Sequence, residues 1–309
     1  MHLIECMMRQ STCYKGTTTG VPVGVLWHDT GAGNPNLKRY VQPDDNAADR
    51  EALLQALGVN GNRNDWNHVS VQSGVNAFIG RLADGSVTTA QVLPWDYRPW
   101  GCGSGRYGSC NGSPNVKNSP FWLQFEICDD GYKSKDYFDA VYREACELTA
   151  YLCARYGLDP MGTVSYNGVT VPVILCHADS YKLGLGSNHG DVLTWFGRFG
   201  KTMEMDDVRR DVAEMMQGGN MAYYKTFESL PDWAKPEIKK IMDAGALRGD
   251  ENGNINLTDE MLRGLIIGAR YTDHVAQSLG GVAAAAREAA KAEVKRIFDA
   301  AFAVSGKCD

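Results

Sequence analysis

Two histidines and an aspartate within residues 176–191 have the types and spacing to bind a metal ion and to move a proton. His177 directly follows an apolar run, residues 171–176, which predicts a buried strand with this histidine at its end. Twelve positions later comes His189, then Asp191, after a loop rich in Gly, Ser and Asn. Imidazole and carboxylate groups are ligands of catalytic metals and can also act as acids or bases. Such a site needs a further ligand from elsewhere in the chain.

Ionisable residues on two other predicted strands supply candidates. Residues 21–27 predict a strand with His28 at its end, followed by a glycine-rich turn. Two strand-end histidines, each followed by a flexible loop, favour a metal site over two unrelated core histidines. Glu126 interrupts an apolar run and shares one strand face with Gln124. A buried carboxylate requires a cation, a metal or a solvent-filled cleft, so Glu126 is predicted either to form a salt bridge or to act in catalysis. His68 lies in a predicted loop and is left outside the ligand set.

The length and composition of the chain indicate a globular protein with one sizeable core and a smaller domain. The chain has 309 residues and a formal net charge of -6, without a basic block, which argues against nucleic-acid binding. No apolar run is long enough to cross a bilayer. The first residues lack the basic and apolar regions of a secretory signal, so we expect synthesis in a cytoplasm.

The nine cysteines contain no Cys-x-x-Cys pair, which argues against a zinc knuckle and a disulfide framework. Four lie in strand-like or helix-like runs and are expected to be buried thiols; they are Cys128, Cys146, Cys153 and Cys176. Cys102 and Cys110 lie in a Gly/Ser loop. These two could pair, but we expect free thiols in a reducing cytosol.

Alternating strand-like and helix-like runs predict an α/β fold with a mixed central sheet flanked by helices. Apolar and period-two runs predict strands at residues 21–27, 74–82, 87–93, 121–128 and 171–176. Helical periodicity predicts helices at residues 46–57, 135–156 and 206–216, with another beginning at residue 192. Between them, residues 94–120 form a long loop rich in Trp, Tyr and Gly. This loop predicts either a wall of a binding groove or a surface loop packed on its own aromatic rings.

The composition changes after a glycine-rich linker at residues 217–220, which predicts domains at 1–216 and 221–309. The second domain is expected to be small and all-α, with helices within 224–249, at 258–271 and at 282–304. The last of these has a thin apolar stripe. That stripe could pair with a helix of this chain or of a second copy, which would give a homo-oligomer.

Together these residues resemble the type-2 N-acetylmuramoyl-L-alanine amidases, relatives of T7 lysozyme and of peptidoglycan recognition proteins. Within that family the chain looks like endolysins from phages or prophages of Gram-positive hosts. The resemblance covers about residues 20–200 and is specific through the combination of its motifs. These motifs are Leu26-Trp27-His28-Asp29-Thr30, Ile79-Gly80-Arg81-Leu82-Ala83-Asp84-Gly85, Gln91-Val92-Leu93-Pro94-Trp95, Gln124-Phe125-Glu126-Ile127, Leu175-Cys176-His177-Ala178-Asp179 and Ser187-Asn188-His189-Gly190-Asp191.

The resemblance implies one zinc ion held by His28, His177 and Asp191, because the family uses two histidines and a third ligand, Asp or Cys. The family's strand carboxylate falls on Glu126, which would take a proton from zinc-activated water. His189 stands where several members have a lysine. Its role is therefore left open between an acid or base, an oxyanion donor and an alternative ligand.

The activity implied is hydrolysis of the amide bond between N-acetylmuramic acid and L-alanine in peptidoglycan. Trp95, Tyr97 and Trp100 of the aromatic loop are expected to line the groove for glycan and stem peptide. A catalytically idle peptidoglycan-binding domain and a zinc peptidase that cuts the stem peptide are the alternatives, and the complete ligand set favours an enzyme over the idle domain. Residues 221–271 vaguely resemble wall-binding segments of the S-layer-homology type, so a secondary wall polymer is an expected partner. The protein would be made in the host cytoplasm and act on the wall after release; a cytosolic amidase that recycles muropeptides is the alternative.

Overall fold

The computed structural model describes residues 1–200, 203–217, 223–224, 226–249, 253, 255, 257–278 and 291–295. The chain divides into two compact units, Met1–Gln217 and Gly218–Asp309. The predicted linker, residues 217–220, spans the division between them.

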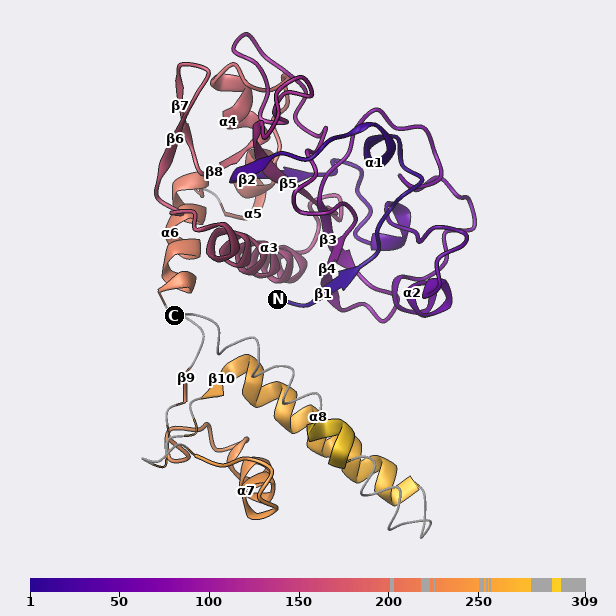
Figure 1. The fold of residues 1–309 in the computed structure, drawn as a ribbon, viewed down its shortest axis with the longest axis vertical. Coiled ribbons are helices and arrows are strands. Elements are labelled where there is room, and N and C mark those ends of the chain that lie inside the picture. The colour runs from indigo at the N-terminus through magenta and orange to yellow at the C-terminus, as the bar shows by residue number, and fades with distance from the viewer. Residues whose placement is uncertain are drawn as a thin grey trace. The chain divides into compact units, whose positions relative to one another are not determined.

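A six-stranded mixed sheet forms the centre of the first unit, with strand order β1-β4-β3-β5-β2-β8 (Figure 1). The strands are β1 (Leu3–Glu5), β2 (Val21–Asp29), β3 (Ala77–Arg81), β4 (Val87–Gln91), β5 (Pro120–Ile127) and β8 (Ile174–Cys176). The β3–β4 hairpin is antiparallel, and the other neighbours run parallel. The predicted α/β fold with a mixed central sheet is confirmed. A separate hairpin, β6 (Thr163–Tyr166) and β7 (Val169–Pro172), turns at Asn167-Gly168.

Helix α3 (Lys135–Tyr156) packs on the sheet against β2, β3 and β4 (Figure 1). It begins where the Ser134 hydroxyl accepts a hydrogen bond from the amide of Tyr137, and it ends at Gly157, whose φ of 63° suits glycine. Its apolar stripe joins Trp27 and Phe125 of the sheet in the main core. The helices α5 (Leu193–Phe199) and α6 (Met205–Met216) also contribute to this core.

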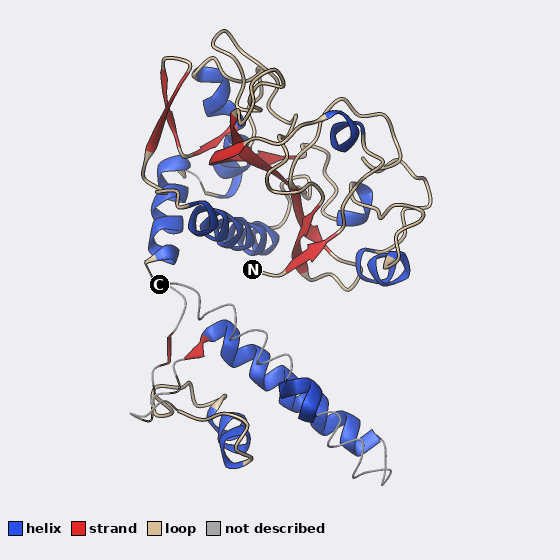
Figure 2. Ribbon diagram, viewed as in Figure 1, coloured by secondary structure: helices blue, strands red, loops and turns tan. Residues whose placement is uncertain are grey.

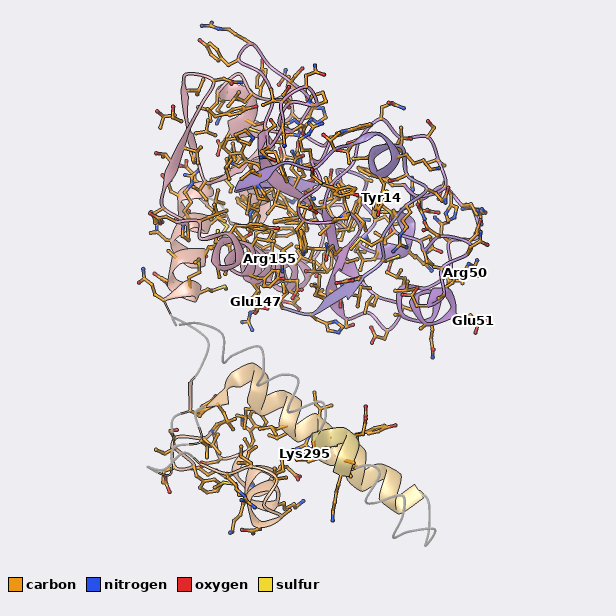
Figure 3. The ribbon with its side chains drawn as sticks, in the orientation of Figure 1. Tyr14, Arg50, Glu51, Glu147, Arg155 and Lys295 are labelled. Carbon is orange, nitrogen blue, oxygen red and sulfur yellow. The ribbon has the colours of Figure 1, made fainter. Side chains whose placement is uncertain are left out.

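Shorter elements complete the first unit: α1 (Thr12–Gly16), η1 (Leu37–Arg39), α2 (Arg50–Leu57) and α4 (His177–Lys182). Leu37 and Leu57 join Phe78 of the sheet in a second core cluster. Residues 92–119 are almost wholly irregular and belong to the tan connections of Figure 2. Glu147 of α3, labelled in Figure 3, pairs with the amino group of Met1.

The second unit contains β9 (Tyr223–Tyr224), α7 (Lys235–Asp243), β10 (Leu257–Thr258) and α8 (Asp259–Ser278). It is helical, as expected, apart from the antiparallel pairing of its two short strands. It has a small core of its own that includes Leu230, Ile238 and Leu262. The predicted helix at 282–304 lies mostly outside the described residues. Only residues 291–295 of this range are described, and they are helical. Within the described ranges, no helix is both long and apolar enough to span a bilayer.

Candidate metal centre and active site

The site lies where three parallel strands end at one edge of the sheet. β2 lies between β5 and β8. His28 is in register with Glu126 across the β2–β5 pair, and Trp27 is in register with Cys176 across the β2–β8 pair. His177 follows at once as the first residue of α4. The carboxyl ends of parallel strands are the usual place for ligands in α/β proteins.

The side chains of His28, His177 and Asp191 converge at this edge. The Nδ1 atom of His28 is 3.0 Å from Oδ2 of Asp191 and 3.1 Å from Nδ1 of His177. The third separation, from His177 Nδ1 to Asp191 Oδ2, is 3.5 Å. Two ligand atoms at about 2.0–2.1 Å from a tetrahedral Zn²⁺ are about 3.4 Å apart. The structure thus brings together the three residues predicted as ligands, with spacing that a metal ion requires.

The outer nitrogen of each histidine already has a hydrogen-bonding partner. His28 Nε2 lies 3.1 Å from Oε1 of Gln124, and His177 Nε2 lies 3.2 Å from Oγ of Ser187. An Nε2–H that donates to such an oxygen leaves Nδ1 unprotonated and free to bind metal. Both histidines are buried, and their rings stand at 89° to each other. The donor set therefore fits a metal ion.

The pKa shifts of His28 and Asp191 also favour metal binding. Burial lowers the pKa of His28, which favours the neutral imidazole that metal binding needs. Burial alone would raise the pKa of Asp191, but hydrogen bonds with His177 and His28 outweigh it and hold the pKa well below its usual range. The set then includes a neutral imidazole from His28 and a carboxylate from Asp191, and both are forms that bind metal.

Glu126 lies beside the ligands as a carboxyl group with high proton affinity. Its side chain is buried, and its Oε2 has no hydrogen-bonding partner among the described residues. Burial, and then the charges of Asp191 and Asp29, raise its pKa well above the ordinary value. It makes no salt bridge with any residue that the structure describes, so the salt-bridge alternative is not supported. A buried carboxyl with a raised pKa beside metal ligands is suited to proton transfer.

Asp29 is a second carboxyl group at this edge, and it was not among the predicted site residues. Burial, followed by the charge of Asp191, raises its pKa to about 7, although the Tyr132 hydroxyl donates a hydrogen bond of 3.1 Å to its Oδ1. Its position directly after His28 at the end of β2 was the available signal.

His189 lies next to the ligand cluster but is exposed. Its side chain is 63% accessible, and its ring is stacked on that of His177 at 4.6 Å with an angle of 4°. Its Nδ1 is 3.7 Å from Oδ1 of Asp191. His189 is therefore placed above the site on its solvent side, and its chemical role remains a prediction. His68 lies apart from this cluster and pairs with Asp65 at 2.8 Å.

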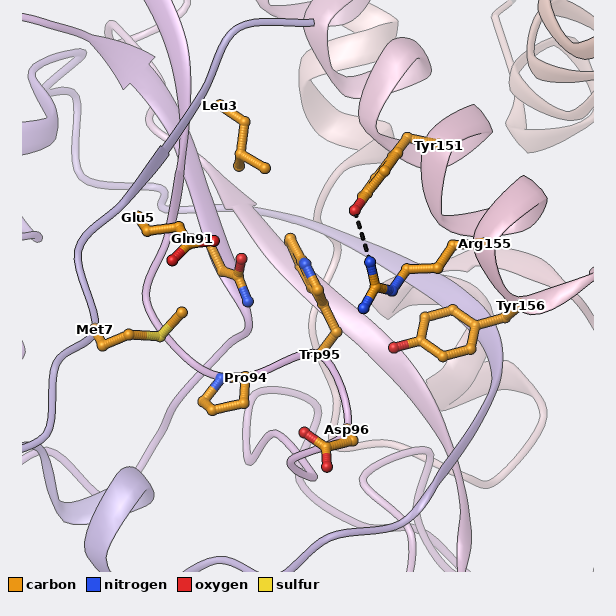
Figure 4. A pocket seen from close by; sticks show the side chains of 10 residues that line it. All are labelled: Leu3, Glu5, Met7, Gln91, Pro94, Trp95, Asp96, Tyr151, Arg155 and Tyr156. Atoms are coloured by element: carbon orange, nitrogen blue, oxygen red, sulfur yellow. Dashed lines mark hydrogen bonds between the residues drawn. The ribbon is translucent and has the colours of Figure 1, made fainter. Parts of the chain in front are cut away.

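The three residues predicted to line a substrate groove have different surroundings. Trp95 is only 7% exposed and belongs to the main core, where it borders a pocket next to Tyr151 and Arg155 of α3 (Figure 4). Trp95 therefore offers little side-chain surface to a substrate, and its groove role stays a prediction. Tyr97 packs against Tyr14 at 5.4 Å, and the groove role of Tyr97 and Trp100 remains a prediction.

All cysteines within the described residues are free and buried, as expected for the four in regular elements. Cys102 and Cys110 belong to one small core cluster together with Trp122 and Leu185. Both side chains are therefore buried beneath the surface of the irregular loop to which they belong.

Residues 18–190 match the N-acetylmuramoyl-L-alanine amidase family Amidase_2. This match spans more than half of the chain, and the chain belongs to that family. The protein is thus an enzyme, a peptidoglycan amidase with a candidate His-His-Asp metal site.

The chain is also similar to several solved structures. The hydrolase AmiA of Staphylococcus aureus, solved with its ligand, is 17% identical with a TM-score of 0.39, over 70% of this chain and 84% of that one. PlyL is 14% identical with a TM-score of 0.38, over 69% and 96%. A mutant endolysin from Bacillus subtilis is 12% identical with a TM-score of 0.38, over 69% and 99%. No curated protein matches the chain.

Proposed function

We propose that the protein is a zinc-dependent amidase that cuts the bond between N-acetylmuramic acid and L-alanine, with His28, His177 and Asp191 as its metal ligands. One observation carries the proposal. The Nδ1 atoms of both histidines and a carboxylate oxygen of Asp191 lie within 3.5 Å of one another, while both Nε2 atoms lie within hydrogen-bonding distance of side-chain oxygens. Two imidazoles and one carboxylate leave a fourth position open on a tetrahedral ion, which is typical of catalytic rather than structural zinc.

A zinc ion held there would supply Lewis-acid polarisation of the amide carbonyl and water that ionises near neutral pH. The residues of the chain provide the proton transfers. Glu126 has an Oε2 without a hydrogen-bonding partner among the described residues, and a zinc ion held beside it would favour its ionised form. It then accepts a proton from the attacking water and passes it to the leaving amine of L-alanine. Its burial keeps competing water away from this carboxyl group.

His189 is the candidate for stabilising the oxyanion that develops on the lactyl carbonyl. It is the exposed member of the site, and its ring lies flat against that of His177. A donor at this position meets the substrate from the solvent side without displacing a ligand. We therefore assign it to the substrate rather than to the metal.

We further propose that the protein acts as an endolysin of a phage or prophage of a Gram-positive host. The resemblance of the motifs around His28, Glu126 and residues 187–191 to endolysins supports this role. The second unit has its own small core, which suits a separate module that holds the enzyme on a secondary wall polymer. The protein would be made in the host cytoplasm and reach the wall after release.

Mass spectrometry of purified Gram-positive wall digested with the protein tests the reaction. A newly freed amino group on L-alanine is the expected product. A freed amino group inside the stem peptide would identify a peptidase instead, and retention on the wall with no product would identify an idle binding domain. The variant His28→Ala is the matched control and should give no product.

The endolysin role has its own test. Lysis should follow when the protein is expressed in a Gram-positive cell whose membrane is then permeabilised, and the isolated wall should retain the protein. Walls stripped of secondary polymers should retain less of it. Equal retention on stripped and intact walls contradicts the role assigned to the second unit.

A further inference from the structure

We propose that Cys102 and Asn111 of the irregular loop position both metal histidines at once, through Gln124 on one side and Ser187 on the other. The inference rests on the proposed metal site and adds residues that act through the ligands. These four are positioning residues, and none of them is assigned a contact with substrate.

The first connection fixes the orientation of His28. Gln124 is 1% exposed; its Oε1 lies 3.1 Å from His28 Nε2, and its Nε2 donates to Oδ1 of Asn111 at 2.8 Å. The two ends of an amide differ, because one accepts and the other donates. Since Asn111 Oδ1 can only accept, the carbonyl end of Gln124 must face His28. His28 then carries its proton on Nε2 and leaves Nδ1 free for the metal.

Asn111 is itself held in one orientation. Its Oδ1 accepts from the backbone amide of Cys102 at 3.2 Å and from the thiol of Cys102 at 3.1 Å. Its Nδ2 donates to the carbonyl of Gly103 at 3.3 Å. A flipped Asn111 amide would place its NH2 group against the backbone amide of Cys102 and its oxygen against the carbonyl oxygen of Gly103, so both contacts would be lost. The orientation of Gln124 therefore depends on Cys102.

The second connection runs from Cys102 to the other histidine. The carbonyl oxygen of Cys102 accepts from the backbone amide of Ser187 at 2.8 Å and from its hydroxyl at 3.3 Å. Because the hydroxyl proton points at this carbonyl, the lone pairs of Ser187 Oγ are left for His177 Nε2, 3.2 Å away. His177 thus carries its proton on Nε2 and also leaves Nδ1 free.

Both connections meet at a single buried residue. The amide and thiol of Cys102 donate to Asn111, which is connected to His28 through Gln124. The carbonyl of Cys102 accepts from Ser187, which contacts His177, and the Cys102 side chain is fully buried. The loop can come this close only because position 101 is glycine, since a Cβ there would lie 2.4 Å from Gln124 Oε1 and 3.3 Å from His28 Nε2. One segment of the loop thereby sets the protonated nitrogen of two histidines that lie 149 positions apart in the sequence.

Metal affinity of the full chain is the direct measurement. Competition with a chromophoric chelator for Zn²⁺ should show about 10- to 100-fold weaker binding for Gln124→Leu, Asn111→Leu and Ser187→Ala, the loss typical for outer partners of metal ligands. The Co²⁺ forms of these variants should have altered visible spectra, because the ligand geometry changes. Asn111→Asp keeps an acceptor oxygen for Gln124 and Cys102, so it should restore most of the affinity lost in Asn111→Leu.

Gln42→Leu is a matched control for Gln124→Leu. Gln42 is also a buried glutamine, 4% exposed, and its amide donates to the carbonyls of Val41 and Gly58, away from the metal ligands. Its replacement should lower thermal stability and leave zinc affinity unchanged. Equal loss of zinc affinity in Gln42→Leu and Gln124→Leu would overturn the positioning role.

The double variant Asn111→Leu/Ser187→Ala tests whether the two connections share Cys102. The fold-loss in zinc affinity should be smaller than the product of the two single losses. A loss equal to that product overturns the shared role of Cys102. If the unaltered protein binds no Zn²⁺, the proposed function itself fails; if it binds one ion and the three single variants bind as tightly, this inference alone fails.

Discussion

The Nδ1 atoms of His28 and His177 lie 3.1 Å apart, although 149 positions separate the two residues in the sequence. The sheet produces this closeness, because β8 pairs directly with β2 and both strands end at the same edge. Asp191 joins them from the loop after α4, where its carbonyl accepts the backbone amide of Ala178 at 3.0 Å. Backbone hydrogen bonds, between β2 and β8 and between Ala178 and Asp191, thus bring the three candidate ligands together without any contribution from their side chains.

Removing one ligand should remove the metal. We expect His28→Ala and Asp191→Ala to contain far less than one zinc per chain by elemental analysis and to release no peptide from wall, because two ligands hold a metal much less tightly than three. His68→Ala is the control and should retain one zinc, since His68 pairs with Asp65 outside the cluster. Full lysis by a metal-free His28→Ala protein would refute the metal mechanism.

Glu126→Gln should retain zinc and lose turnover by about 100- to 10,000-fold, the contribution of a positioned general base. Measured zinc content separates this result from loss of the metal. Unchanged turnover would remove Glu126 from the mechanism.

The same variant should change how stability depends on pH. Folding raises the pKa of Glu126 above its ordinary value of 4.5, so the folded protein holds this proton more tightly than the unfolded chain. The carboxyl therefore destabilises the metal-free fold increasingly as the pH rises above 4.5. Glutamine cannot ionise, so the Tm of Glu126→Gln relative to the unaltered protein should increase from pH 5 to pH 8 with chelator present. A Tm difference that does not change with pH would contradict the raised pKa.

His189→Ala should keep one zinc per chain and lower turnover by about 100-fold, as expected for loss of one oxyanion donor. The reason is its place on the exposed side of His177, outside the ligand cluster. His189→Lys restores a cationic donor and should recover part of the rate. Zinc loss in His189→Ala would instead make this histidine a ligand.

Gly101→Ala should destabilise the first unit by about 1–3 kcal/mol, because the added methyl group meets Gln124 Oε1 at 2.4 Å. Denaturant unfolding measures the loss. Gly61→Ala is the matched control, since a Cβ at Gly61 has no neighbour within 4 Å, and it should be close to neutral. Equal effects of the two changes would contradict the close packing of the loop over His28.

A chain ending at Gln217 should fold and still cut soluble muropeptides, because the main core draws on residues up to Met215 and the second unit has a separate core. It should lose retention on intact wall. Circular dichroism and the mass-spectrometric assay check the two halves of this prediction. A truncated protein that cannot fold would show that the first unit depends on the second.

The long elements could be predicted because their patterns are strong. Helix α3 has the predicted bounds, Lys135–Tyr156, since its apolar residues recur at helical spacing between Ser134 and Gly157. The apolar run ending at His28 likewise predicted β2. By contrast, β1 has only three residues with no clear period, and its pairing with β4 depends on contacts across the sheet.

The sequence predicted the candidate ligands of the site but not the hydrogen bonds that orient them. Period-two alternation placed Gln124 and Glu126 on one strand face, yet gave no reason to connect Gln124 with His28. That connection exists because the irregular loop folds back over the end of the sheet, and loop paths are not encoded by periodicity. Trp95 shows the same limit, because an aromatic residue in such a loop has the same sequence pattern whether it faces a groove or the core.

The place of β2 between β5 and β8 also determines when the enzyme can become active during its own synthesis. A ribosome-bound chain that has emerged only through β5 contains His28 and Glu126 but neither His177 nor Asp191. Chains grow at about 5–20 residues per second, so roughly 8–30 seconds separate the appearance of His28 from that of Asp191, 163 positions later. Until Asp191 has emerged and β8 has joined the sheet, the nascent protein lacks the complete candidate metal site, and under the proposed mechanism it cannot act as a hydrolase.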